Sequence, residues 1–190
     1  MQKIKIFLAS SNELKAERDQ FEIEIYRKCK AWFDKDIFLH LDIWEDMTAR
    51  LSVTGSQSEY DKYVKGADLF VFLAYSKVGM YTAEEFENAI GQFVSTKKPF
   101  IYTYFKVPQP DNADPSLAAF EAKLSELKHF YANFSDFNDL WNQFNKELER
   151  LETDGFTENK RPEGEGGNKT INQTAEKIYN IDKIDTANFS

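Results

Sequence analysis

The chain has 190 residues, of which 42% are apolar and 15% aromatic, and its formal net charge is −8. This apolar content can build a packed interior, so a wholly disordered chain is excluded. The acidic balance argues against a nonspecific nucleic-acid binder, which needs a basic face to displace counterions, and against electrostatic docking on anionic membranes. No apolar run approaches the ~20 residues of a membrane span, and Lys3 and Lys5 interrupt any signal peptide. We therefore expect a cytoplasmic protein.

Cysteine and histidine are too sparse for a disulfide or a zinc site. The single cysteine, Cys29, lies in a helical pattern near Trp32, which favours a small buried residue over a reactive thiol. His40 and His129 lie far apart in sequence, with no ligand spacing around them. We expect neither a metal nor a bound cofactor.

The first part of the chain alternates between strand and helix patterns. Residues 4–9 are an apolar run typical of a central strand, and Ser10, Ser11 and Asn12 are good helix-capping residues. Residues 36–44 alternate and predict a second strand. The apolar residues expected on one face of the intervening helix are Leu14, Phe21, Ile25, Cys29 and Phe33.

A long polar segment, residues 45–57, follows the second strand and predicts a functional or mobile loop. A short helix ended by Gly66 comes next. Residues 68–75 then predict a buried strand, and a glycine-containing loop leads into a helix over residues 81–96. Its expected apolar stripe is Phe86, Ala89, Ile90, Phe93 and Val94.

The remaining elements repeat this alternation. We expect a strand at 99–105, a helix at 116–130, a short fifth strand at 131–134 and a last helix at 137–151, capped by Ser135 or Asp136. The middle helix should bury Leu117, Phe120, Leu124 and Leu127. This order predicts an α/β, flavodoxin-like, doubly wound domain over residues 1–152, with a mostly parallel five-stranded sheet.

The C-terminal part differs in composition. Residues 153–170 are polar and glycine-rich, which predicts a flexible linker. In residues 171–190, Ile178, Ile181 and Ile184 recur every three residues. That segment cannot bury itself, so we expect it to dock on this domain, on another copy, or on a sensor module or partner protein.

The helix after the third strand carries the most informative carboxylates. By helical spacing Glu84 points away from the apolar stripe, while Glu85 lies at its edge, near the carboxyl ends of the strands. A partly buried carboxylate there suits a ribose hydroxyl or a developing oxocarbenium ion. The alternative is structural, because Thr82 and Glu85 have the spacing of a capping box.

Further candidates follow the first two strands. Ser10 and Ser11 suit phosphate or ribose oxygens, or simple helix capping. Trp44 suits stacking on a base or closure of the core. Arg50 suits a phosphate, or an ion pair with Glu45 or Asp46. There is no dinucleotide fingerprint, Walker motif or nucleophile elbow, which counts against Rossmann dehydrogenases, P-loop NTPases and α/β hydrolases.

Together, these pieces resemble bacterial TIR-like domains. The resemblance rests on KIFLASSNELKAERDQF (5–21), DIWED (42–46), SQSEYDKYVKGADLFVFLAY (56–75) and GMYTAEEFENA (79–89), and spans residues 3–151. Its most specific part is the pattern of an aromatic, then Glu, an apolar residue and Ala, here Tyr81, Glu85, Phe86 and Ala89. Nucleoside deoxyribosyltransferases, which also cleave N-glycosidic bonds, have similar helix starts.

The resemblance implies an NAD+ hydrolase or cyclase. The family glutamate falls on Glu85, or on Glu84 if the register slips by one. It would hold the ribose hydroxyls and stabilise positive charge as nicotinamide leaves, while Trp44 or Tyr81 stacks on a ring. The other substrate-binding residues implied are Ser10, Ser11, Glu45, Arg50 and Tyr75.

The resemblance also implies partners. Active sites of such domains commonly assemble between neighbouring copies, so we expect a homo-oligomer with NAD+ as substrate, activated by clustering in anti-phage defence. Two alternatives stay open: a noncatalytic TIR module that signals by self-association, and a nucleoside deoxyribosyltransferase-like enzyme. Loss of NAD+ on clustering would favour the NAD+ hydrolase over the noncatalytic module. Base exchange on deoxynucleosides without NAD+ turnover would favour the deoxyribosyltransferase-like enzyme.

Overall fold

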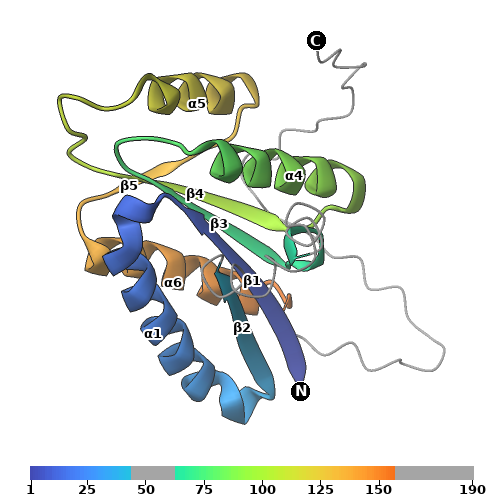
Figure 1. The fold of residues 1–190 in the computed structure, drawn as a ribbon. Helices are drawn as coiled ribbons and strands as arrows, with labels where there is room; N and C mark the ends of the chain where they lie inside the picture. The colour runs from blue at the N-terminus through green and yellow to red at the C-terminus, as the bar shows by residue number, and fades with distance from the viewer. Residues whose placement is uncertain (44–62, 157–190) are drawn as a thin grey trace, which may run out of the picture. The chain divides into compact units, whose positions relative to one another are not determined.

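Five parallel strands form one sheet in the order β2-β1-β3-β4-β5 (Figure 1). The computed structural model describes residues 1–43 and 63–156. The strands are β1 (Gln2–Ser10), β2 (Ile37–Ile43), β3 (Leu69–Ala74), β4 (Phe100–Lys106) and β5 (Ala132–Phe134). The helices are η1 (Asn12–Leu14), α1 (Lys15–Trp32), η2 (Phe33–Lys35), α4 (Met80–Thr96), α5 (Pro115–Glu126) and α6 (Phe137–Thr153), and residues 63–66 are also helical. The expected flavodoxin-like fold is confirmed.

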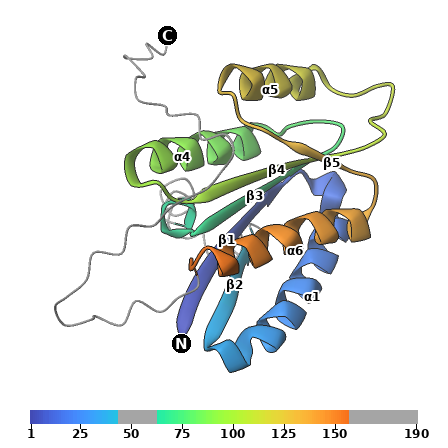
Figure 2. The ribbon, with the colours of Figure 1, turned by 180° about the vertical axis from the view of Figure 1, so that it is seen from behind.

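The sheet separates two layers of helices. α1 and α6 cover one face and α4 and α5 the other (Figures 1 and 2). Because side chains alternate along a strand, β1 sends Ile6 and Leu8 into one core and Phe7 and Ala9 into the other. Strands covered on both faces need apolar residues throughout, which is why β3 reads as a continuous apolar run, buried at every position.

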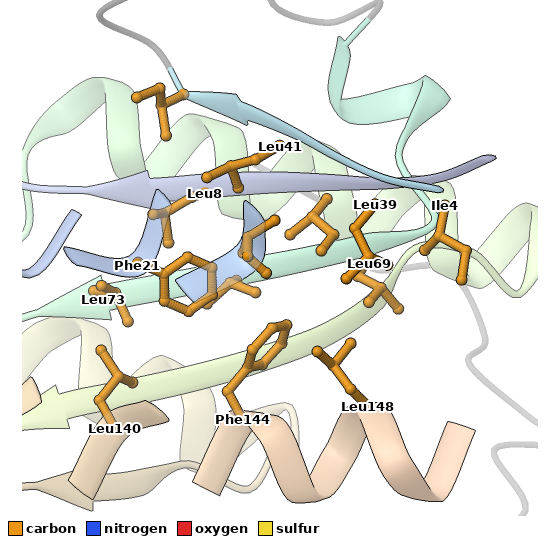
Figure 3. Packing of buried hydrophobic residues seen from close by; sticks show 14 of the residues in the cluster. Ile4, Leu8, Phe21, Leu39, Leu41, Leu69, Leu73, Leu140, Phe144 and Leu148 are labelled. Carbon is orange, nitrogen blue, oxygen red and sulfur yellow. The ribbon is translucent and has the colours of Figure 1, made fainter. Parts of the chain in front are cut away.

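The core under α1 and α6 joins these two helices to all five strands. Figure 3 shows Phe21 of α1 beside Leu8 and Leu73 of the sheet, while Leu148 of α6 points toward Leu69. Phe144 of α6 lies between Leu140 and Leu148 and also points toward the sheet. The rings of Phe21 and Phe144 lie 5.0 Å apart between centroids. Each such side chain contributes roughly 1.5–3 kcal/mol by leaving water. The last helix, capped by Asp136 as expected, is thereby held to the domain.

The opposite core is built from stacked phenylalanines. The rings of Phe72 and Phe120 stack at 4.6 Å, and Phe86 of α4 meets Phe120 edge-on at 4.9 Å. These contacts fix the rotation of α4 about its own axis. That rotation decides the direction of every other side chain on α4, including its glutamates.

Three residues expected in the core are exposed. Phe33 is 66% exposed and Trp32 is buried in its place, because α1 ends at Trp32 and the tighter 3-10 turn of η2 changes the rotation per residue. Leu127 is 37% exposed because α5 ends before it, at Glu126. Val94 is 54% exposed and lies roughly 80° around α4 from Phe86, at the outer limit of the stripe.

Other expectations hold within the described residues. Cys29 is buried, and the alternating strand β2 buries Ile37, Leu39, Leu41 and Ile43. Beyond α6, the ring of Phe156 lies 5.4 Å from that of Phe100, so the chain still packs on the domain there. The expected loop at 45–57, residues 157–170 of the expected linker and the isoleucine-rich segment 171–190 lie outside the described residues.

Candidate functional site

The order in which successive strands are added to the sheet reverses between β1 and β3, although all strands are parallel. From β1 it passes outward to β2, then returns to add β3 on the other side of β1. Helix α1, which follows β1, and helix α4, which follows β3, therefore lie on opposite faces (Figure 1). Open α/β sheets usually bind ligands at such a switch point, outside the carboxyl ends of the strands. Ser10 pairs with Leu73 in register, so Ser10, Ser11 and Tyr75 lie at this edge.

A buried arginine organises the loop after β1. Arg18 of α1 is 1% exposed, and its Nη1 donates to Ser10 Oγ at 2.7 Å and to the Ser11 carbonyl at 2.7 Å. Ser10 and Ser11 are themselves buried. Ser11 occupies the N-cap position of η1, but its side chain makes no capping bond. The capping interpretation of Ser11 is therefore wrong, and its hydroxyl instead donates to Glu13 Oε1 at 2.9 Å.

Glu13 joins the loops that follow β1 and β3. Its Oε1 accepts the Ser76 N–H at 2.9 Å, and its Oε2 accepts from Ser76 Oγ. Burial raises the pKa of Glu13, but hydrogen bonds from the Ser76 side chain and backbone, Ser11 and the Lys77 backbone outweigh it. The net pKa lies below the usual value, so Glu13 is a carboxylate at neutral pH.

A lysine holds the aromatic ring at the end of β3. Lys106, the last residue of β4, places its Nζ 2.5 Å from Glu17 Oε1 and 5.2 Å from the centroid of the Tyr75 ring. Glu17 is only 8% exposed, so this ion pair is partly desolvated. The cation over the ring face orients Tyr75 at the edge of the sheet.

Helix α4 begins earlier than its sequence predicts. Gly79 is its N-cap, without a side-chain capping bond, and the Ala83 N–H already donates to the Gly79 carbonyl at 3.0 Å. Thr82 therefore lies inside the helix and is buried, and Glu85 lies in the second turn. The capping-box interpretation is wrong, because a capping box needs Thr82 at the N-cap and Glu85 in the first turn.

Glu85 is half-buried, and burial raises its pKa to about 7, with the Glu84 carboxylate adding to the effect. Glu84 is also half-buried rather than pointing freely into solvent. Glu87 forms an ion pair with Lys123 of α5. Two residues along a helix correspond to roughly 200°, so Glu85 lies on the flank of α4 that faces away from α5.

The structure brings only some of the expected site residues together. Ser10, Ser11 and Tyr75 share the edge of the sheet with Glu13 and Lys106. The expected substrate-binding residues Trp44, Glu45 and Arg50 lie outside the described residues, and of Tyr81 the structure describes only the backbone, in the first turn of α4.

Sequence reasoning missed Glu13, Glu17, Arg18 and Lys106. Arg18 had a signal: it lies four residues after Leu14 and three before Phe21, on the buried face of α1, where a charged side chain needs polar partners. Lys106 had none, because its partners Tyr75 and Glu17 come from distant parts of the chain.

No family model, curated protein or solved structure matches the chain. Across residues 1–43 and 63–156, no group of three or more His, Cys, Asp or Glu side chains could hold a metal ion. No helix in the same part of the chain is long and apolar enough to cross a membrane. The candidate site is thus a half-buried carboxyl that titrates near neutral pH, Glu85, on the helix next to a polar edge of hydroxyls and paired charges.

Proposed function

We propose that this protein is an NAD+ nucleosidase in which Glu85 promotes cleavage of the bond between nicotinamide and ribose. The observation that carries the proposal is the setting of Glu85: a half-buried carboxyl, in the second turn of the helix after the switch-point strand, with a pKa raised to about 7. Helix capping does not account for Glu85, because the N-cap of α4 is Gly79 and Glu85 lies in the second turn. Perturbed carboxyls near ligand-binding edges are candidates for chemistry.

The reaction needs a carboxylate rather than an acid. The nicotinamide of NAD+ is cationic, so it leaves with the bonding electron pair as a neutral base and requires no proton. Its departure leaves positive charge on the ribose, which the Glu85 carboxylate would stabilise while holding the ribose hydroxyls. Water then attacks the same carbon and loses a proton, giving ADP-ribose.

The environment of Glu85 favours such differential stabilisation. Burial penalises its charged form in the free protein, as the raised pKa records. A cation forming next to the carboxylate removes that penalty. The interaction therefore strengthens as the ribose becomes positive, which is the property that accelerates a reaction.

The other residues have proposed roles in binding. Ser10 and Ser11 would contact phosphate or ribose oxygens, and Tyr75, oriented by Lys106, would lie beside the substrate. Trp44 or Tyr81 would stack on a ring, while Glu45 and Arg50 complete the set, as the resemblance to TIR-like domains implies. The same resemblance supports a site completed by a neighbouring copy, activation by clustering and a role in anti-phage defence.

The test is NAD+ consumption by the full chain, at high concentration and fused to an oligomerising domain. Wild type should release nicotinamide when clustered, Glu85→Gln should not, and Glu87→Gln should match wild type because Glu87 faces α5. Loss in Glu84→Gln alone would move the catalytic role to Glu84. Self-association without NAD+ loss would favour a noncatalytic module, and base exchange on deoxynucleosides without NAD+ loss would favour a deoxyribosyltransferase.

A further inference from the structure

Glu13 spans the switch point between β1 and β3. The residue lies in η1, directly after β1, yet its carboxylate accepts from the Ser76 N–H and the Ser76 hydroxyl, in the loop after β3. It also accepts from the Ser11 hydroxyl, on its own side. One carboxylate therefore ties together the two loops between which open α/β sheets usually bind ligands.

The loop after β3 is also held from its other side. The Asp114 N–H donates to the Ser76 carbonyl at 2.7 Å, and the Val78 N–H donates to Ser116 Oγ at 3.1 Å. Both partners belong to the start of α5, where Asp114 is the N-cap. Ser76 is thus fixed between Glu13 and Asp114, three residues before Gly79 begins α4.

Among the described residues, no side chain caps the start of α4. Gly79 is the N-cap without a side-chain bond, so the first turn depends on its backbone bonds, on the buried Val78 and Thr82, and on the loop that leads into it. Further along, Phe86 anchors the helix in the phenylalanine core. Glu85 lies between these two anchor points, so a shift of the loop would be transmitted to its turn of the helix.

We propose that Glu13 is a positioning residue for Glu85: by holding Ser76 it fixes the loop that starts α4, and with it the direction of the Glu85 carboxyl. The inference rests on the proposed function for its catalytic consequence, but its structural part is independent. Glu13 is not proposed to contact the reacting atoms. Its effect passes through Ser76 and the first turns of α4.

Two variants separate the bonds involved. Glu13→Ala removes every bond to Ser76, whereas Ser76→Ala removes only the hydroxyl bond and keeps the backbone N–H bond. Asp19→Asn is the matched control, because Asp19 is an exposed carboxylate of α1 that pairs with Lys15 of the same helix. Should Glu13→Ala fail to fold, Ser76→Ala carries the test, with the same direction and a smaller effect.

The decisive readout is the pKa of the Glu85 carboxyl, followed by carbon NMR in the full chain without substrate. Wild type should titrate near 7. Glu13→Ala should lower that midpoint toward the ordinary value, because a freed start of α4 lets water reach the carboxyl, and Asp19→Asn should leave it unchanged. An unchanged midpoint in both Glu13→Ala and Ser76→Ala would overturn the proposal, even if wild type cleaves no NAD+.

The kinetic readout tests the catalytic consequence. In clustered protein, Glu13→Ala should lower kcat by about 10- to 100-fold while changing KM much less, since misplacement by about 1 Å has an effect of that size. Glu13→Gln keeps an oxygen that can accept from Ser76, so it should retain part of the rate. Equal kcat values for Glu13→Ala, Asp19→Asn and wild type would overturn the proposed effect of Glu13 on catalysis. Wild type without NAD+ cleavage would instead defeat the proposed function and leave the NMR result to decide the positioning.

Discussion

Glu85 and Glu87 are two residues apart on α4 yet occupy opposite flanks of it. Glu87 pairs with Lys123 of α5, whereas Glu85 is half-buried on the flank away from α5, with a pKa raised to about 7. The packing of Phe86 between Phe72 and Phe120 sets this division. The core of the domain thus determines that Glu87 is exposed and Glu85 is half-buried.

Glu85→Gln should stabilise the fold at pH 8 while removing activity. The carboxyl binds its proton more tightly in the folded protein than in the unfolded chain, so stability falls as pH rises from about 4.5 to about 7. Glutamine removes that loss. We expect a gain of roughly 1–3 kcal/mol at pH 8 and little change at pH 4, measured by urea unfolding.

Glu87→Gln is the matched control for stability. Its ion pair with Lys123 is exposed, so the free energy of unfolding should change by only about 0–1 kcal/mol, in the destabilising direction. Equal gains in the free energy of unfolding at pH 8 from Glu85→Gln and Glu87→Gln would show that burial does not destabilise the ionised form of Glu85.

The rate should rise with pH through the titration of Glu85. Because the carboxylate is the active form and its pKa is raised to about 7, kcat/KM should fall about tenfold per pH unit below that midpoint. Glu84→Gln should move the midpoint to lower pH, since the Glu84 charge contributes to the raised pKa. A profile independent of pH between 5 and 8 would contradict the role of an ionised Glu85.

Lys106→Ala should destabilise the protein more than Lys123→Ala does. Removing Lys106 leaves the Glu17 carboxylate, 8% exposed, without this partner, and we expect a loss of roughly 1–3 kcal/mol. Removing Lys123 breaks an exposed pair and should cost about 0–1 kcal/mol. Thermal unfolding at constant pH compares the two, and equal losses would contradict the buried character of the Lys106–Glu17 pair.

Phe86→Ala should be among the most damaging core substitutions on α4. Phe86 is fully buried against Phe72 and Phe120, so the lost contacts and the cavity should cost about 3–5 kcal/mol. Val94→Ala, at a position 54% exposed on the same helix, should change stability by about 0.5 kcal/mol or less. Similar losses would show that α4 is rotated differently about its axis.

The fold was predictable because its signals are local. Alternation in β2 and continuous apolar runs in β1 and β3 identify strands, and their order along the chain defines the parallel sheet. Two of the three errors in the expected core lie at helix ends. Phe33 and Leu127 fall just beyond the ends of α1 and α5, where the period of the helix no longer applies.

The candidate site was less predictable than the fold. Helical periodicity puts Glu85 at the edge of the apolar stripe, in agreement with its half-burial, but it puts Glu84 in solvent, which is wrong because Glu84 is half-buried too. The capping box failed because Thr82 and Glu85 have the right spacing but the N-cap of the helix is Gly79, three residues before Thr82. The bonds of Glu13 to Ser76 and of Lys106 to Glu17 join residues that are far apart in sequence, and no local pattern reports such pairs.

Nicotinamide release by clustered full-length protein tests the central claim most directly. Wild type and Glu87→Gln should both release nicotinamide from NAD+, in amounts equal to the ADP-ribose or cyclic ADP-ribose formed. Glu85→Gln should remain folded and release no nicotinamide. Nicotinamide release by Glu85→Gln at the wild-type rate, or none from wild type under clustering, would contradict the assignment of NAD+ cleavage to Glu85.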